Sequence, residues 1–201
     1  MKGLGNFIIK PKNERYDNTV KVGDKSLITN TKVEDHRSVS KRAIVLEVPL
    51  AFKTDIKKGD EVIVHHNIFR RFYDIRGVEK NSGSFFKDDM YFANVSQIYA
   101  YKRNGEWHAN SEYCFVKPLE ETSCFSTEKE RSHIGILKYS NSSLEALKIS
   151  PGDLVGFSKN SEFEFVFNGE RVYCMKSNDI TIKYEYKGDE KEYNPSWAKG
   201  R

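Results

Sequence analysis

The chain has 201 residues, of which 33 are basic and 29 acidic, so its formal net charge at pH 7 is +4. This length accommodates one domain or two small ones. The small basic excess occurs in short pairs with acidic residues nearby, which excludes the clustered basic stripe of a dedicated nucleic-acid binder. The aromatic residues are mainly Phe and Tyr, which favour strands over helices.

The apolar runs and the cysteines indicate the cellular location of the protein. No run approaches the roughly 18 apolar residues of a membrane span, and the N-terminus lacks the apolar core of a signal peptide. We therefore expect a soluble, cytoplasmic protein that does not bind membranes. Cys114, Cys124 and Cys174 lie far apart without a CxxC spacing, which predicts buried, reduced thiols.

An internal repeat organises the chain. Two apolar residues and a Lys-Pro pair at 8–11 recur at 115–118 and predict the first strand of each copy. Three more landmarks follow in the same order: a short apolar strand, a Gly-Asp turn that enters a strand, and a closing strand. These landmarks occupy 43–48, 56–64 and 91–99 in the first copy and 134–139, 149–157 and 173–181 in the second. The repeat predicts domains at 1–103 and 110–186 and a C-terminal tail at 187–201.

The first copy is longer than the second at two places. From Pro11 to Ala43 is 32 positions, whereas from Pro118 to Ile134 is 16. The first extra segment, at about 12–42, is polar and predicts a long mobile loop. The second, at about 76–90, has Gly and Ser near its middle and predicts an elongated hairpin.

Two local patterns complete the predicted elements. Asn104-Gly105 is typical of a hairpin turn, and it precedes a short connector between the copies. Residues 142–147 have the composition of a single helical turn.

Motifs for catalysis or nucleotide binding are absent from the sequence. Neither a GxSxG elbow nor a Gly-rich phosphate loop occurs, so we expect no enzymatic activity and no cofactor. His65 and His66 are the one adjacent histidine pair. Neighbouring residues of a strand point to opposite faces, so we expect no metal site there.

The order of these landmarks resembles that of the GroES-type co-chaperonin family. The closest part is 167–180, which is similar to the family's ending, an acidic hairpin that leads into a strand near Ser-x-Asp-Ile. The resemblance touches both halves of the chain, although each motif is short. It implies an all-β fold of two tandem small GroES-like β-barrels. Plastid co-chaperonins join two such domains and some bacteriophages encode divergent versions, so the resemblance implies a divergent phage or bacterial duplicate, in the host cytoplasm if phage-encoded.

The resemblance also implies a function. In that family a mobile loop after the first strand docks into the apical domains of a GroEL-type chaperonin, and the subunits form a homo-oligomeric ring that covers the folding chamber. The matching chaperonin-binding residues here are Ser26, Leu27, Ile28, Thr29 and Asn30. The second copy has no comparable loop, so one domain per chain is expected to dock. The alternative for this segment is an ordinary hairpin with strands at 20–22 and 26–28 and a turn at Gly23-Asp24.

Two other functions remain open on the sequence alone. One is a structural or virion scaffold protein that uses the same tandem barrels. The other is a barrel that binds single-stranded nucleic acid, with Phe69, Phe72 and Tyr73 beside Arg70 and Arg71 as a stacking platform. We expect the partner to be a chaperonin and not nucleic acid.

Overall fold

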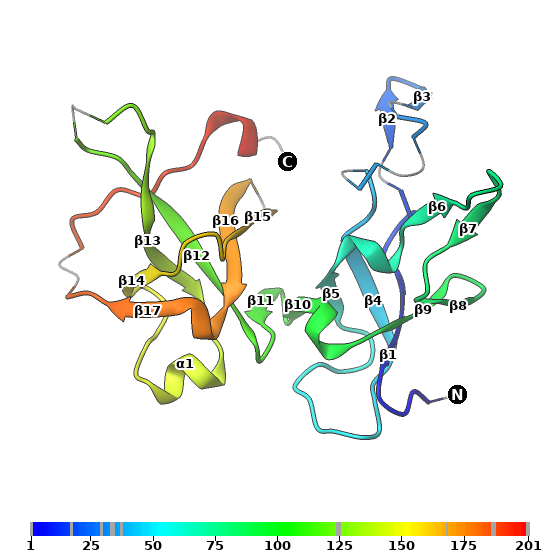
Figure 1. The fold of residues 1–201 in the computed structure, drawn as a ribbon, viewed down its shortest axis with the longest axis horizontal. Helices are drawn as coiled ribbons and strands as arrows, with labels where there is room; N and C mark the ends of the chain where they lie inside the picture. Colours follow the sequence, from blue (N-terminus) through cyan, green and yellow to red (C-terminus); the bar gives the residue numbers. More distant parts are fainter. Residues whose placement is uncertain are drawn as a thin grey trace. The chain divides into compact units, whose positions relative to one another are not determined.

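The computed structural model describes residues 2–16, 18–28, 30–32, 35–36, 38–123, 126–167, 169–185 and 188–199. The chain divides into two compact units, Met1–Glu106 and Trp107–Arg201, and the division falls within strand β11 (Figure 1). Antiparallel strands dominate both units, and the one α-helix of the described residues has five residues. The fold is therefore all-β, as the composition predicts. No described helix is long and apolar enough to cross a membrane.

Unit 1 is built on a seven-stranded antiparallel sheet with the order β11-β10-β5-β4-β1-β9-β8. Two further hairpins, β2–β3 and β6–β7, form separate two-stranded sheets. The strands are β1 (Phe7–Pro11), β2 (Thr19–Val22), β3 (Lys25–Ile28), β4 (Arg42–Glu47), β5 (Glu61–Val64), β6 (Arg71–Tyr73), β7 (Glu79–Asn81), β8 (Phe85–Lys87), β9 (Met90–Ala93), β10 (Ile98–Arg103) and β11 (Glu106–Ala109), with 3-10 turns η1 (His66–Ile68) and η2 (Val95–Gln97).

Unit 2 is built on a six-stranded antiparallel sheet with the order β15-β16-β12-β13-β14-β17. Its elements are β12 (Tyr113–Glu120), β13 (Glu130–Tyr139), α1 (Ser142–Ala146), β14 (Leu154–Phe157), β15 (Phe163–Phe167), β16 (Glu170–Lys176), η3 (Ser177–Asp179), β17 (Ile180–Lys183) and η4 (Ser196–Ala198). The helix α1 confirms the helical turn predicted at 142–147. Its N-cap is Asn141, whose side chain accepts from the backbone N–H groups of Ser143 and Leu144.

The two units share one strand order. Read from one edge, six strands of unit 1 have the order β8-β9-β1-β4-β5-β10, and the six strands of unit 2 have the order β15-β16-β12-β13-β14-β17. When each set of six is numbered along the chain, both sheets have the order 4-5-1-2-3-6. A register irregularity separates Ile8 from Ile9 in β1 and Phe115 from Val116 in β12. The repeat that the sequence shows is thus a repeat of topology and register.

Strand pairing corrects the alignment of the second landmark by one residue. Pro11 lies opposite Ala43, and Pro118 lies opposite Gly135 and not opposite Ile134. Gly135 is required at this point because a Cβ there would lie 2.4 Å from the carbonyl oxygen of Lys117. The apolar run 134–137 hides this offset, since a shift by one residue still leaves apolar residues in place.

The cores of the two units use equivalent positions. Phe7 packs in the core of unit 1 and lies opposite Ala93, whereas the equivalent Cys114 of unit 2 lies opposite Met175. A large and a small side chain thus exchange sides of one cross-strand pair. Such an exchange preserves core volume, which is what close packing demands.

The predicted Gly-Asp turns also repeat in detail. The Asp60 carboxylate accepts from the N–H of Lys57 and the guanidinium of Arg103, at 2.8 and 2.6 Å. In unit 2 the Asp153 carboxylate accepts from the N–H of Ser150 and the ammonium of Lys183, at 2.8 and 2.6 Å. Each turn is therefore held by a basic residue at the end of an equivalent strand, β10 in unit 1 and β17 in unit 2.

Closed barrels, which the resemblance implies, are not found among the described residues. The end strands of each sheet, β11 and β8 in unit 1 and β15 and β17 in unit 2, pair with a strand on one side only. Closure requires the two end strands to pair with each other. Here β8 has three residues and pairs with β9 alone, so both sheets keep open edges.

The two extra segments of unit 1 are more ordered than expected. The predicted loop at 12–42 contains the β2–β3 hairpin, so the alternative conformation is the one observed. At about 76–90, where we expected one elongated hairpin, two short hairpins form. Their turns lie at Asp74–Val78 and at Asp88-Asp89, and Ser82, near the expected tip, is held to the body because its hydroxyl donates to the carbonyl of Ile68.

The C-terminal segment belongs to unit 2. Glu192 forms a bridge with Leu119, and the N–H of Tyr193 donates to the carbonyl of Pro118 at 2.8 Å. Arg131 pairs with Glu190 at 2.6 Å, and Ala198 is buried. The described part of the predicted tail thus pairs with β12 and packs against its unit.

Candidate docking surface

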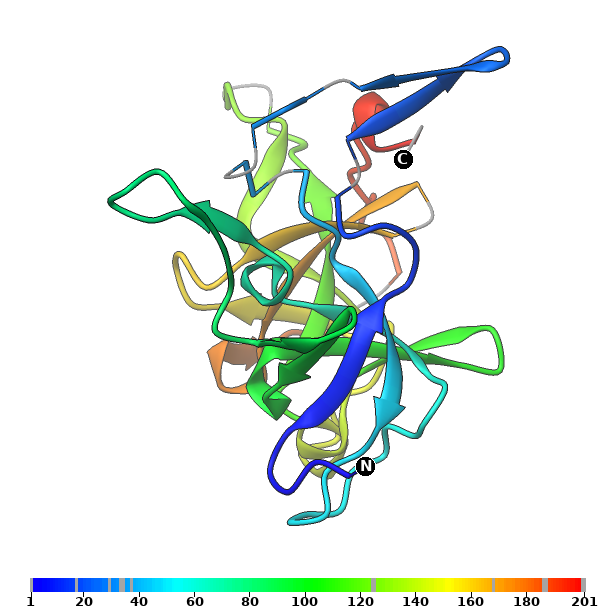
Figure 2. The ribbon, with the colours of Figure 1, turned by 90° about the vertical axis from the view of Figure 1, so that its right-hand side faces the viewer.

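The β2–β3 hairpin exposes apolar side chains to solvent. Val22, Leu27 and Ile28 are 63%, 59% and 62% exposed, and all four residues of β3 are exposed. The hairpin projects from the rest of unit 1 (Figure 2). Gly23 forms the turn with a φ of 61°, a conformation that residues with side chains rarely adopt. A lone two-stranded hairpin is marginally stable in water, so this element has little support of its own.

The five residues expected to bind a chaperonin have different places in this hairpin. Ser26, Leu27 and Ile28 lie on β3 and are exposed. Thr29 lies outside the described residues. Asn30 is part of the base, where its carbonyl accepts from the side chain of Asn18 at 2.9 Å and its amide donates to Asp35 at 2.5 Å. Val22 is also exposed on this hairpin, although it is not one of the five residues expected to bind. The alternation of polar and apolar residues at 19–22 is the sequence pattern that could have identified it.

Arg15 and Tyr16 join the first extra segment to the second. The Arg15 guanidinium donates to the carbonyl of Phe69 at 2.5 Å and to Oδ1 of Asn81 at 2.6 Å. The Tyr16 hydroxyl accepts from the N–H of Arg71 at 2.8 Å, and the Arg71 guanidinium lies 4.8 Å from the centre of the Tyr16 ring. The base of one hairpin is therefore fixed to the base of the other.

The β6–β7 hairpin is a second exposed apolar element. Phe72, Tyr73, Ile75 and Val78 are exposed large apolar residues, and Ile75 is fully exposed. The β2–β3 hairpin lies at the end of unit 1 opposite the N-terminus, and the β6–β7 hairpin projects from the side of the unit, in a different direction (Figures 1 and 2). This element was not expected, because the Gly and Ser residues at 82–84 indicated a hairpin tip there and not at Asp74 and Gly77.

The proposed stacking platform for nucleic acid does not form in this conformation. Phe69 is buried, and Phe72 and Tyr73 are neighbours on β6, so they point to opposite faces. Arg71 is already paired with Glu79 at 2.7 Å. Phe69, Phe72 and Tyr73 therefore do not form one stacking surface in this conformation.

Unit 2 carries a polar network where unit 1 carries its Arg15 anchor. Tyr91 and Tyr173 occupy equivalent register positions, opposite Ile9 and Val116, and each has a guanidinium over its ring. In unit 1 this guanidinium belongs to Arg15, and in unit 2 it belongs to Arg171. Each unit thus places an arginine on the same tyrosine.

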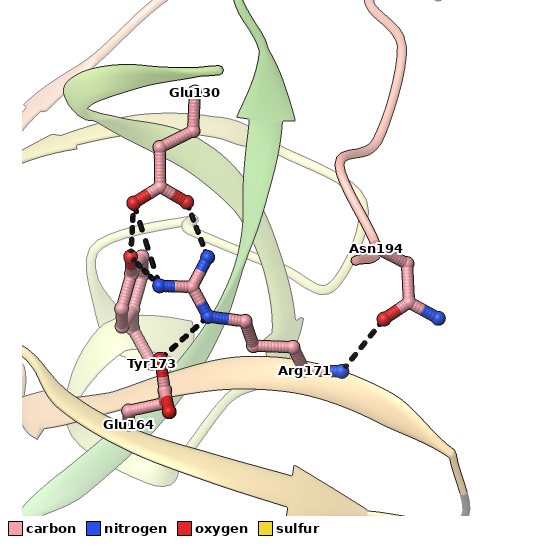
Figure 3. A network of polar contacts seen from close by, with 5 residues as sticks. All are labelled: Glu130, Glu164, Arg171, Tyr173 and Asn194. Carbon is pink, nitrogen blue, oxygen red and sulfur yellow. Dashed lines mark hydrogen bonds and ion pairs between the residues drawn. The ribbon is translucent and has the colours of Figure 1, made fainter. Parts of the chain in front are cut away.

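Arg171 is the centre of the unit 2 network (Figure 3). Its guanidinium donates to Glu130 at 2.5 Å, to Glu164 at 2.7 Å and to the Tyr173 hydroxyl at 2.7 Å, and that hydroxyl donates to Glu130 at 2.6 Å. The backbone N–H of Arg171 donates to the side chain of Asn194. Burial and the bond to Glu130 raise the pKa of Tyr173. Each side chain of the network has at least one hydrogen bond within it, which is typical of a structural network.

Three histidines lie together in unit 1. The rings of His65 and His66 stack with centres 4.4 Å apart, and the His36 ring is 5.4 Å from that of His66. The expectation that His65 and His66 point to opposite faces was wrong, because β5 ends at Val64 and His66 begins η1. Burial and the neighbouring His65, His36, Lys41 and Arg70 lower the pKa of His66 to about 4. Among the described residues no group of three or more His, Cys, Asp or Glu side chains could hold a metal ion.

The thiols of Cys114 and Cys174 are buried and reduced. Burial raises the pKa of Cys114 to about 12, and burial together with Cys114 raises the pKa of Cys174. Thiols that stay protonated are poor nucleophiles. Cys124 lies outside the described residues.

Charge is divided unevenly between the units. Unit 1 contains 20 basic and 14 acidic residues, whereas unit 2 contains 13 basic and 15 acidic residues. The positive excess of the chain therefore belongs to the unit that carries both exposed hairpins.

Searches of protein-family models and of curated proteins found no match to this chain.

Proposed function

We propose that this protein is a co-chaperonin of the GroES type that has no enzymatic activity of its own. Its chains form a ring-shaped lid on a GroEL-type chaperonin and assist protein folding there. The two units are divergent copies of the GroES-like barrel domain, with open sheets in place of closed barrels. The β2–β3 hairpin of unit 1 binds the apical domains of the chaperonin, and unit 2 supplies the wall of the lid.

The exposed apolar hairpin carries this proposal. Leu27 and Ile28 are more than half exposed, none of the described side chains of this hairpin belongs to the apolar core, and unit 2 keeps the same six-strand order without the hairpin. The hairpin is therefore dispensable for the scaffold. An apolar element that orders fully on binding gives moderate affinity and reversible release, as a lid requires.

The open sheet edges support assembly of a ring. Each outer strand presents unpaired backbone groups on one side, which is a template for pairing with another copy of the chain. A head-to-tail contact of this kind closes into a ring when its rotation permits. Several hairpins on one ring would then bind at high effective concentration, so weak single contacts suffice.

Binding to a purified GroEL-type chaperonin in the presence of ATP tests the docking role. The wild type is expected to bind, and Leu27→Asp is expected to weaken the affinity per site by about tenfold or more, since it removes an apolar side chain from the contact. Leu147→Asp is the matched control, because Leu147 is an exposed leucine of unit 2. A wild type that does not bind, or a Leu27→Asp variant that binds like the control, would contradict the proposal.

A structural scaffold, such as a virion component, is the second candidate, and the open edges favour it equally. The native mass in solution separates the two functions. A lid requires a closed oligomer of defined size, whereas a scaffold can form open assemblies whose mass rises with concentration.

A further inference from the structure

The β6–β7 hairpin carries a second group of exposed apolar side chains, with Ile75 and Val78 in its turn and Phe72 and Tyr73 on opposite faces of β6. Ile75 is fully exposed, and Phe72, Tyr73 and Val78 are exposed within the same seven positions. None of them belongs to the apolar core of unit 1. Single exposed apolar residues are ordinary, but a group of four on one projecting element is typical of an interaction surface.

Hydrogen bonds hold the tip in one conformation. Oδ1 of Asp74 accepts from the N–H groups of Arg76 and Val78, both at 2.9 Å. The N–H of Asp74 donates to the carbonyl of Val78 at 3.0 Å, and Gly77 permits the turn with a φ of 73°. Below the tip Arg71 pairs with Glu79. Binding of a partner over Ile75 therefore costs little conformational entropy, because the turn is already ordered.

The β6–β7 hairpin and the β2–β3 hairpin are joined at their bases in unit 1. Arg15 and Tyr16, which begin the first extra segment, bond to the backbone at Phe69, Arg70 and Arg71, where the β6–β7 hairpin begins. Unit 2 has no counterpart of either two-stranded sheet among its described residues. A partner that contacts both hairpins thus meets two apolar elements with a common base.

Charge indicates the chemistry of the partner. Arg76 adjoins Ile75 at the tip and makes no ion pair within the described ranges. Unit 1 has six more basic than acidic residues. An apolar knob beside an unpaired guanidinium fits an apolar pocket that is bordered by carboxylates.

We propose that the β6–β7 tip is a second docking element, in which Ile75 enters an apolar pocket of the chaperonin and Arg76 pairs with a carboxylate at the edge of that pocket. This inference rests on the proposed co-chaperonin function. Docking is thus bipartite: the weakly supported β2–β3 hairpin orders on binding, and the rigid β6–β7 tip supplies a fixed second contact. Two linked contacts bind more tightly than either one alone.

Titration of a purified GroEL-type chaperonin with ATP tests this inference on the full chain. Ile75→Asp is expected to weaken binding by about tenfold or more. Arg76→Glu is expected to weaken binding and to reduce its dependence on salt concentration, because it removes an ion pair across the contact. The matched controls in unit 2, Leu147→Asp and Lys159→Glu, are expected to bind like the wild type. Ile75 and Arg76 are exposed, so all variants are expected to keep the far-UV circular dichroism of the wild type.

The outcomes separate this inference from the proposed function. If Leu27→Asp weakens binding but Ile75→Asp and Arg76→Glu do not, the second element is overturned and the co-chaperonin function stands. If the wild type does not bind the chaperonin, both proposals are overturned. Binding of a single-stranded oligonucleotide that Arg76→Glu abolishes would also overturn the inference, since it assigns the tip to nucleic acid.

Discussion

Removal of the Arg171 guanidinium is expected to destabilise unit 2 strongly. The Arg171 side chain is only 12% exposed, and it bonds to the carboxylates of Glu130 and Glu164. Truncating one partner of a buried ion pair costs about 3–5 kcal/mol, because the other charge stays buried and unpaired. Here Glu130 and Glu164 are partly exposed and can regain water. We therefore expect Arg171→Met to lower the free energy of unfolding by about 2–3 kcal/mol.

Tryptophan fluorescence provides a selective assay. Trp107 and Trp197 are the two tryptophans of the chain and both lie within 107–201, and the Trp197 ring is 5.9 Å from the Arg171 guanidinium. Because Trp107 lies on β11, which pairs with β10 of unit 1, the measurement uses a Trp107→Phe background, in which urea unfolding followed by Trp197 fluorescence reports on unit 2. Lys117→Met is the control, since it breaks one ion pair with the half-exposed Glu192 and is expected to cost less than about 1 kcal/mol. Equal losses in Arg171→Met and Lys117→Met would refute the reasoning.

Four further perturbations test other parts of the structure. Arg15→Met is expected to accelerate hydrogen exchange in 12–16 and 69–82, because the carbonyls of Phe69 and Arg70 lose their donor; unchanged exchange would contradict the coupling of the hairpins. Gly135→Ala is expected to lower the free energy of unfolding by about 2 kcal/mol or more, measured by fluorescence, because its Cβ would clash with the Lys117 carbonyl. Gly152→Ala is the matched control, since its Cβ would meet no atom and only its φ of 95° would be strained, and an equal loss in both variants would contradict the clash. Partial burial opposes ionisation of Asp153, but hydrogen bonds from Lys183 and Ser150 lower its pKa overall. The stability that Asp153 contributes is therefore present above the unfolded pKa of about 3.9 and is lost as pH falls through the lower, folded value. Asp153→Asn should destabilise the protein at pH 7, and this effect should disappear in acid; an effect that does not depend on pH would contradict the reasoning. In a Cys124→Ser variant the remaining thiols should react with a disulfide reagent only on unfolding, and rapid reaction of the native protein would contradict the burial of Cys114 and Cys174.

The repeated strands could be predicted because their evidence is local. Lys-Pro after two apolar residues and Gly-Asp before a strand each occur twice in one order, and the pairing of β1 and β12 with equivalent partners follows from that order. Asn104-Gly105 gave the β10–β11 hairpin correctly, with φ values of 52° and 89°. The one-residue offset at Gly135 could not be predicted, because it depends on close contact with a neighbouring strand.

The exposed hairpins were harder to predict. Polar composition at 12–42 favoured a loop, yet the short alternation around Gly23-Asp24 is sufficient for a hairpin whose described side chains lie outside the core. At 70–90 the Gly and Ser residues near 82 were weaker turn formers than Asp74 with Gly77, since Asp74 also satisfies two backbone donors. The links from Arg15 to Phe69 and Asn81 join positions more than 50 residues apart, and no local pattern predicts them.

Because the two units share one strand order, unit 2 corresponds to a version of unit 1 that lacks the two additional hairpins. Unit 2 shows which strands suffice for the sheet, and unit 1 shows where the same sheet accepts additional hairpins. Because Arg15 and Tyr16 of the first extra segment need the backbone at 69–71, neither segment keeps its conformation if it is transplanted alone. The two segments should therefore be inherited, lost or grafted as a pair, and a chimera of unit 2 that receives only one of them should leave that hairpin unanchored.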